Sequence, residues 1–418
     1  MNHTHPTATT PPLGLALRIL LPFAAGYFLS YLFRSVNAVI APELGHTLQL
    51  DAATLGGLTS VYFLTFALFQ LPLGLLLDRY GPRRVESLLL LVAAGGALLF
   101  ASSHDLAGLT LGRALIGLGV SACLMASFQL INQWFPAEKV PAMNGWILAS
   151  GGLGALSATR PIEIALGFTD WRGVMLILAV LTVLVAALIW LTTPERHTMQ
   201  RQSLGPLLGG IATIFRDTYF WRIVPLVVAT QATFLAIQGL WAGPWFSDVA
   251  GLDRVGVANH LLFTAVAMVC GFLLIGQIAS RLNQFGVPLV LITLIGMSLF
   301  MLAQLGIILE LLNFTLPLWL LFGFFGSSSI LSYPLLNRYF PKNLTGRVNT
   351  NINLLVFASA FLVQWLMGGV IDGWPAAEHS GYQPQGYQLA FGLMLGLQLL
   401  ALIWFILGLC RPVPVYGQ

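Results

Sequence analysis

Charged residues are scarce in this sequence: Asp, Glu, Lys and Arg make up 8% of its 418 residues. Soluble domains carry about 25% charged residues, whereas 57% of this chain is hydrophobic. A chain with this balance has the lipid bilayer as its main solvent. Membrane topology explains the small net charge of +4 better than nucleic-acid binding does, and we expect no nucleic-acid partner.

Cysteine is also scarce, with only Cys123, Cys270 and Cys410, all inside apolar stretches. An odd number of scattered, buried thiols argues against a disulfide framework or a metal site. The sequence also lacks a phosphate-binding loop of the GxxxxGK[ST] type and an HExxH motif. We therefore expect no enzymatic activity, no cofactor and no transport driven by ATP within this chain.

Long apolar segments, in contrast, are abundant. A membrane helix needs about 20 apolar residues to cross roughly 30 Å of hydrocarbon. Twelve segments meet this requirement, at 15–41, 54–77, 84–102, 106–131, 141–166, 171–193, 220–247, 256–281, 286–309, 315–340, 347–372 and 386–410. The sequence therefore predicts an all-α integral membrane protein with 12 transmembrane helices.

The longest polar segment in the interior of the chain, 194–219, divides these spans into two groups of six. We expect an N-terminal six-helix bundle over 15–193, a central cytoplasmic loop, and a C-terminal bundle over 220–410. Residues 1–14 lack the basic start and cleavage site of a signal peptide. They are predicted to form a disordered cytoplasmic tail, and 411–418 a second cytoplasmic tail.

The basic residues near the span ends predict the orientation in the membrane. If the N-terminus is cytoplasmic, only Arg172 and Arg254 of these basic residues face outward. Cytoplasmic loops of membrane proteins carry an excess of Lys and Arg. The sequence thus predicts that both termini are cytoplasmic, which requires an even number of spans.

Between the second and third spans the sequence reads GLLLDRYGPRR, over residues 74–84. This stretch resembles the loop between helices 2 and 3 of the major facilitator superfamily of secondary transporters. The resemblance rests on Gly74, Asp78, Arg79, Gly81, Arg83 and Arg84. In that family the Asp and Arg lock the N-terminal half to helix 11 in one conformation. Pro82 departs from the family pattern.

The resemblance implies two six-helix bundles related by pseudo-two-fold symmetry, alternating access, and a monomer in a bacterial inner membrane. The second half keeps a trace of the same loop, since Gly276 and Arg281 stand at the offset of Gly74 and Arg79. Ser280 replaces the aspartate. We therefore expect the lock of the second half to be weak or absent.

Span 5 bears on the subfamily. Drug–proton antiporters of this superfamily carry a glycine–proline signature there, and this chain has Gly145 and Gly154 at the right separation. The expected Gly–Pro pair is Ala158–Thr159 instead. This departure counts against the first alternative, proton-coupled multidrug efflux. A second alternative is a membrane sensor or assembly factor that transports nothing, and the Asp78–Arg79 pair counts against it.

Three arginines lie well inside predicted spans, away from the span ends: Arg34, Arg113 and Arg160. Each is roughly 9 to 12 Å from the outer end of its span, and ionisable groups at such depth are functional candidates. Guanidinium offers forked donors to carboxylate or phosphate, so the cluster predicts a site for a small organic anion. The alternatives are a structural role for Arg113 and an ion pair of Arg160 with Glu163.

In the superfamily, helices 1, 4, 7 and 10 line the central cavity. The residues that we expect in an amphipathic binding pocket are Arg34, Tyr27, Tyr31, Arg113, Gln238, Trp241 and Tyr333. Ordinary hydrogen bonding between helices uses the same residue types and is the alternative. The segment around Arg34 resembles helix 1 of organophosphate–phosphate antiporters, which place a second arginine in the C-terminal half. Span 7 has no arginine beyond Arg222 at its start.

We expect no carboxylate deep in any span. A proton-driven cycle would then use a peripheral acid, Glu43 or Glu163, with Arg160 beside the latter. The alternative partner is a counter-anion, since an anion that neutralises the buried arginines would permit exchange across the bilayer. The sequence favours this second scheme.

Overall fold

The computed structural model describes residues 12–136, 139–195, 212–341, 344–375 and 381–409. Every regular element in these ranges is a helix. The predicted terminal tails and the predicted central loop lie largely outside the described residues. Within the described ranges, eleven helices are long and apolar enough to cross a membrane.

The N-terminal half contains the first six predicted spans. Its helices are α1 (Leu13–Ser35), α2 (Asn37–Leu48), α3 (Ala52–Tyr80), α4 (Pro82–Ser102), α5 (Leu106–Gly119), α6 (Cys123–Trp134), α7 (Val140–Ser157), α8 (Arg160–Ala165) and α9 (Trp171–Thr192). Spans 1, 4 and 5 each consist of two helices in succession. Span 5, as α7 and α8, is the predicted span that is not among the eleven continuous candidates.

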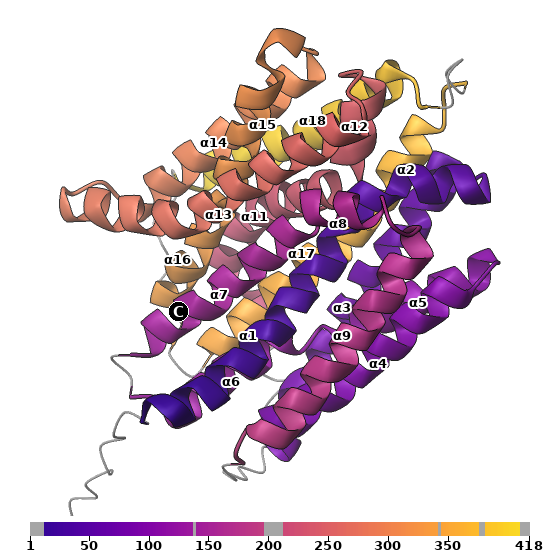
Figure 1. Ribbon diagram of the computed structural model, residues 1–418. Coiled ribbons are helices and arrows are strands. Elements are labelled where there is room, and N and C mark those ends of the chain that lie inside the picture. The colour runs from indigo at the N-terminus through magenta and orange to yellow at the C-terminus, as the bar shows by residue number, and fades with distance from the viewer. Residues whose placement is uncertain (1–11, 137–138, 196–211, 342–343, 376–380, 410–418) are drawn as a thin grey trace, which may run out of the picture.

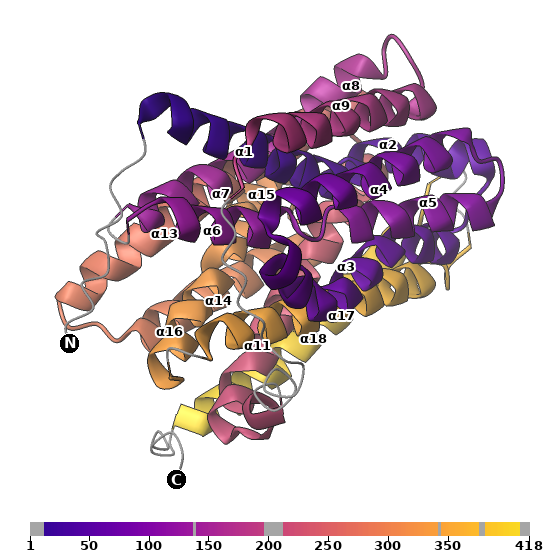
Figure 2. The ribbon, with the colours of Figure 1, turned by 90° about the horizontal axis from the view of Figure 1, so that it is seen from below.

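The C-terminal half repeats this order. Its helices are α11 (Thr218–Ala236), η1 (Ile237–Trp241), α12 (Ala242–Asp248), α13 (Arg254–Gln284), α14 (Leu289–Ile308), η2 (Leu312–Phe314), α15 (Thr315–Gly326), η3 (Ser327–Leu331), α16 (Ser332–Tyr339), α17 (Thr345–Ile371) and α18 (Pro384–Leu409). The all-α membrane fold is therefore confirmed. In two perpendicular views the indigo-to-magenta half and the rose-to-yellow half lie side by side (Figures 1 and 2).

Large apolar side chains cover the outer surface of both halves. Leu184 and Leu400, for example, are 59% and 67% exposed, one in each half. Such exposure is unfavourable in water and expected in lipid, where the backbone polar groups are satisfied inside each helix. The chain is an integral membrane protein.

Aspartates begin many of the spans. A side-chain oxygen of each accepts a hydrogen bond from the backbone N–H three residues later, at 2.7 to 3.1 Å. These N-caps are Asp51, Asp105, Asp170, Asp217 and Asp253. The caps satisfy N–H groups that have no partner in the helix. Capping accounts for these acids at the span ends without a role in transport.

The loop of the GLLLDRYGPRR stretch is a single residue between two helices. Gly81 has φ of +79°, a conformation that residues with a Cβ avoid. Pro82 is the first residue of α4, where its fixed φ suits a helix and its missing N–H costs nothing. Pro82, although it departs from the family pattern, is therefore compatible with the turn.

The two halves pack tightly at one end of the molecule, which we name the Asp51 end. An ideal Cβ on Gly243 of α12 would lie 1.9 Å from the Ala38 carbonyl oxygen of α2. A Cβ on Gly368 of α17 would lie 2.4 Å from the carbonyl oxygen of Ala52. Glycine permits this close approach of backbones. The opposite end, which carries the α3–α4 turn, we name the Asp78 end.

Candidate functional site

Spans 1, 4, 7 and 10, the four expected to line a central cavity, are all interrupted part-way along. Span 1 breaks at Val36, span 4 at 120–122, span 7 at the π-helix η1 and span 10 at the 3₁₀-helix η3. Breaks of this kind expose backbone groups inside the protein and mark binding sites in transporters. Side chains meet two of the freed carbonyls, since the Ser30 hydroxyl donates to Val120 and the Gln70 amide to Ser121.

Arg34 lies at the end of α1, beside these breaks. Its side chain is only 8% exposed, and no carboxylate pairs with it among the described residues. Its guanidinium carbon lies 4.5 Å from the ring centroid of Tyr31, 5.4 Å from that of Phe66 and 5.0 Å from that of Phe357. Phe357 belongs to α17, so both halves contribute to this aromatic cage.

The cage does not balance the buried charge. Cation–π contacts contribute about 0.5 to 2 kcal/mol each, whereas an unpaired ion in a protein interior costs several kcal/mol. The Nε of Arg34 also has no hydrogen-bond partner within the described part of the chain. An anion at this position would supply the missing partner.

Arg113, on α5, is the second buried cation and is 1% exposed. It donates to the backbone carbonyl of Phe33 at a long 3.5 Å, and its guanidinium carbon lies 5.2 Å from the ring centroid of Tyr62. Tyr62 also interacts with Arg34. The two arginines therefore share Tyr62, and no carboxylate of the described residues separates their charges.

The tyrosines expected in the pocket meet near Arg34. The rings of Tyr27 and Tyr31 are in edge contact, with centroids 5.2 Å apart. Tyr333, in α16, interacts with Tyr31, and its hydroxyl donates to the side-chain oxygen of Asn353 at 2.6 Å. The structure thus brings together Tyr27, Tyr31, Arg34 and Tyr333 from both halves.

The two remaining expected pocket residues, Gln238 and Trp241, have hydrogen-bond partners in the C-terminal half. The Trp241 indole is fully buried at the Asp51 end and donates to the Gln364 carbonyl at 3.2 Å. The Gln238 amide lies 3.4 Å from the Met268 sulfur, within the C-terminal half. The position of Trp241 fits a role in closing that end rather than in touching a substrate near Arg34.

The peripheral charges meet at the Asp51 end around Arg254, which was not among the predicted site residues. Arg160 pairs with Glu163. Arg254, from the other half, lies 3.6 Å from Glu43 and 4.0 Å from Glu163. The sequence alone did not indicate this junction, because Arg254, the first residue of α13, lies far from both acids along the chain. The junction joins the two halves.

One acid near the start of the third span is buried. Glu86, one turn into α4, has a fully buried side chain. It stands inside the predicted span 84–102, so the acid itself was visible in the sequence. Its position just after Arg84 is typical of an interfacial acid, whereas the packing of α6 against α4 and of Gly26 from α1 against the carboxyl decides its burial.

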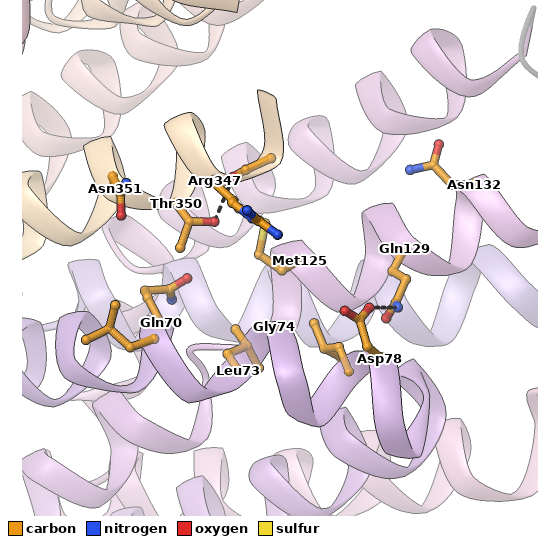
Figure 3. A pocket seen from close by; sticks show the side chains of 13 residues that line it. Gln70, Leu73, Gly74, Asp78, Met125, Gln129, Asn132, Arg347, Thr350 and Asn351 are labelled. Carbon is orange, nitrogen blue, oxygen red and sulfur yellow. Dashed lines mark hydrogen bonds between the residues drawn. The ribbon is translucent and has the colours of Figure 1, made fainter. Parts of the chain in front are cut away.

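A cavity of about 400 Å³ lies at the Asp78 end, between α3, α6 and α17 (Figure 3). Asp78 lines it and accepts a hydrogen bond from the Gln129 amide at 3.1 Å. Gly74 lines it too, and the facing wall is α17, with Arg347, Thr350 and Asn351. Sequence reasoning missed this polar wall, since amides and hydroxyls in a membrane helix carry no pattern that separates cavity from packing.

The other residues of the loop have separate positions. Arg83 contacts the backbone carbonyl of Trp190, and Arg84 forms two hydrogen bonds to Glu195, at 2.7 and 2.9 Å. These contacts hold the turn to the end of α9, within the N-terminal half. The guanidinium carbon of Arg79 lies 5.2 Å from the Tyr80 ring centroid.

Comparison with known proteins identifies the family. The sequence matches the profile of the Major Facilitator Superfamily over residues 23–364. The chain belongs to this superfamily. Its fold agrees, since a bacterial homologue of the human lysosomal transporter Spinster, solved in an inward-facing and unoccupied conformation, superposes with a TM-score of 0.73 over 95% of this chain and 97% of that one, at 16% identity.

Two curated relatives handle anions by name. A probable L-galactonate transporter of Escherichia coli is 30% identical over 42% of this chain and 41% of its own length. A probable sulfoacetate transporter of Cupriavidus necator is 21% identical over 59% of this chain and 60% of its own length. The alignments thus span about two-fifths and three-fifths of these relatives.

Proposed function

We propose that this transporter moves a small organic anion, amphipathic in character, across the membrane by alternating access. The observation that carries the proposal is Arg34, a buried guanidinium with an aromatic cage and no carboxylate partner among the described residues. The planar fork binds the anionic group, and Arg113 adds positive potential from behind Tyr62. Tyr27, Tyr31 and Tyr333 offer hydroxyls and apolar ring faces to the rest of the substrate. The names of the two anion-transporting relatives support the same class.

The structure corresponds to one state of an alternating-access cycle. In this state the Asp51 end is closed and the Asp78 end is open. At the Asp51 end, Gly243 and Gly368 pack against the opposite half and Arg254 reaches Glu43. At the Asp78 end, a polar cavity separates α3 from the start of α17. The excess of basic residues at the latter end supports a cytoplasmic position for it, and we therefore assign this state as inward-facing.

We assign the lock of the opposite state to Asp78 and Arg79. When the Asp78 end closes, the cavity between α3 and α17 disappears and Asp78 approaches Arg347. Gly74 and Gly81 permit the approach and the turn, while Arg83 and Arg84 keep the turn attached to α9. At the other end, Glu43, Glu163 and Arg160, joined through Arg254, form the corresponding lock of the inward-facing state.

Binding of a panel of compounds tests the substrate class. Purified protein is screened by thermal shift against sugar acids including L-galactonate, small sulfonates, organic cations and neutral sugars. We expect stabilisation by anions only, and loss of at least about ten-fold in affinity in Arg34→Lys, because a point charge does not reproduce the fork. Arg18→Lys, an exposed change on the same helix, is the matched control. Stabilisation by cations alone, or an Arg34→Lys protein that binds anions like the wild type, contradicts the proposal.

A further inference from the structure

The Glu86 carboxyl is the most unusual buried group in the transporter. Its side chain is 0% exposed, and neither Oε1 nor Oε2 has a hydrogen-bond partner of good geometry within the described residues. Nothing in the substrate site or in the two locks uses it. A buried carboxyl without partners requires an explanation, since such groups are costly and rarely retained without a role.

Three helices enclose Glu86. From α1, Gly26 lies so close that an ideal Cβ there would be 2.3 Å from the Glu86 Oε1. From α6, the Cys123 thiol lies beside the carboxyl and interacts with it. Cys123 stands roughly 16 Å from the end of α6 at Trp134, at the break of span 4. The carboxyl therefore reaches the middle of the N-terminal bundle.

The same neighbours connect Glu86 with the anion site. Gly26, which lies against the carboxyl, belongs to α1, the helix that carries Arg34. Tyr27, next to Gly26, is in edge contact with the ring of Tyr31, whose centroid lies 4.5 Å from the Arg34 guanidinium carbon. Any shift of α1 that follows binding at Arg34 therefore changes the space around the carboxyl.

The charged surroundings of Glu86 are sparse. Cys123 is the titratable group that faces it from α6, and Gly26 with Tyr27 faces it from α1. Within the described residues, no charged side chain of α3, α5 or α9 pairs with it. On α4 itself, Arg83 is turned toward Trp190 and Glu195.

Two opposing effects act on its ionisation. Burial of an unpaired carboxylate costs several kcal/mol, whereas the N-terminus of α6 favours a negative charge nearby by at most about 2 kcal/mol. The neutral acid is therefore the stable form in the enclosed state seen here. A modest opening toward water, or the approach of an uncompensated Arg34, is sufficient to favour the carboxylate.

We infer that Glu86 binds the coupling proton, so that this chain is a proton–anion symporter; the inference rests on the proposed anion site at Arg34. With both ligands bound, Glu86 is a neutral acid and the anion neutralises Arg34. With neither bound, the Glu86 carboxylate offsets the Arg34 charge. A proton alone or an anion alone leaves one extra charge in the interior, while Arg113 is the same in all four forms.

The net charge of the interior therefore determines which forms of the transporter can change conformation. A net charge in the closed, low-dielectric interior costs several kcal/mol, so only the fully loaded and the empty transporter pass readily between the two states. One proton then accompanies one monovalent anion, and transport is electroneutral. This scheme replaces anion exchange as the obligatory cycle, because the empty site is no longer left with an unbalanced arginine.

Infrared difference spectroscopy of the full-length protein in lipid tests the proton site without any substrate. The C=O stretching band of a protonated carboxyl should decline as the pH rises in the wild type. It should be missing from Glu86→Gln, and retained in Asp105→Asn, a change in an exposed helix cap that asparagine still supports. Gly26→Ala, which intrudes on Oε1, should shift the position of the band. A wild-type spectrum without this band, or the same titrating band in Glu86→Gln, overturns the inference.

Proteoliposome transport, with L-galactonate as the probe, tests the coupling. An inward proton gradient should drive accumulation in the wild type and in Asp105→Asn. In Glu86→Gln net accumulation should fall by at least about ten-fold, since the empty form keeps an unbalanced arginine. Exchange of labelled for unlabelled probe should continue, because glutamine resembles the neutral acid.

The outcomes separate the two proposals. Accumulation in Glu86→Gln that still follows the proton gradient overturns the role of Glu86 while leaving the anion site intact. If the wild type carries no L-galactonate and thermal shift finds no anion, the proposed substrate class fails. The infrared titration then still decides whether Glu86 is a proton site.

Discussion

The guanidinium carbon of Arg34 lies 5.0 Å from the ring centroid of Phe357, on a helix of the other six-helix half. Phe357 in turn lies 4.3 Å from the ring centroid of Phe66, in the N-terminal half. The substrate-binding arginine that we propose thus touches both moving bodies. Binding there changes the contact between the halves directly, which is the requirement for a ligand that shifts a conformational equilibrium.

Phe357→Ala removes the contribution of the C-terminal half to the cage. We expect about three- to ten-fold weaker anion binding, from the loss of a cation–π contact worth about 1 kcal/mol, with the fold retained. Isothermal titration or thermal shift with L-galactonate measures the change. Phe361→Ala, one turn along the same helix, is the control, and equal losses in the two variants would contradict a specific role of the cage.

Gly243→Ala should prevent closure of the Asp51 end. The added Cβ would lie 1.9 Å from the Ala38 carbonyl oxygen of the other half, a backbone clash that only separation of the halves relieves. We expect the population to shift toward the state open at that end. Distances between spin labels on the loops of the two halves report the shift.

Gly145→Ala is the matched control for this prediction, because a Cβ there meets no atom within 4 Å. An unchanged distance distribution in Gly243→Ala would show that the observed packing is not required for closure.

Asp78→Asn should fold and lose most of its transport. Asparagine keeps the shape and can still bond to Gln129, but it lacks the charge that we propose to meet Arg347 when the Asp78 end closes. Uptake into proteoliposomes, with the amount of folded protein checked by gel filtration, measures the loss. Asp105→Asn provides an equal change of charge at an exposed cap, and full transport by Asp78→Asn would refute the lock.

Closure of the Asp51 end should depend weakly on pH through Asp372. Burial and the nearby charge of Asp51 raise the pKa of Asp372 in the closed state. At low pH Asp372 is neutral in both states, and the closed state has its full stability relative to the open state. As the pH rises through the raised pKa, the closed state loses stability, because the open state releases the Asp372 proton first.

The side chain of Asp372 is exposed, so solvent screens the effect and we expect a change of only a few-fold in the population of closed molecules. The same spin-label distances, followed as a function of pH, measure it. Asp372→Asn should remove the dependence without affecting closure at low pH, and a stronger closure at high pH would reverse the sign that we derive.

Local properties of the sequence determined the membrane class, the spans and the turn at Gly81. Apolar runs of sufficient length must cross the bilayer as helices, because no other open structure satisfies the backbone there. The buried Arg34 was visible for the same reason, as a charge in the middle of an apolar run.

Only the tertiary structure decided which side chains meet. The burial of Glu86 depends on how α1 and α6 cross α4, and the junction at Arg254 on how the two halves dock. The position of Trp241 at the Asp51 end depends on the π-helix that rotates the end of span 7. Hydropathy determines that a helix lies in the membrane, but its rotation and its neighbours follow from the packing of side chains that are distant along the chain.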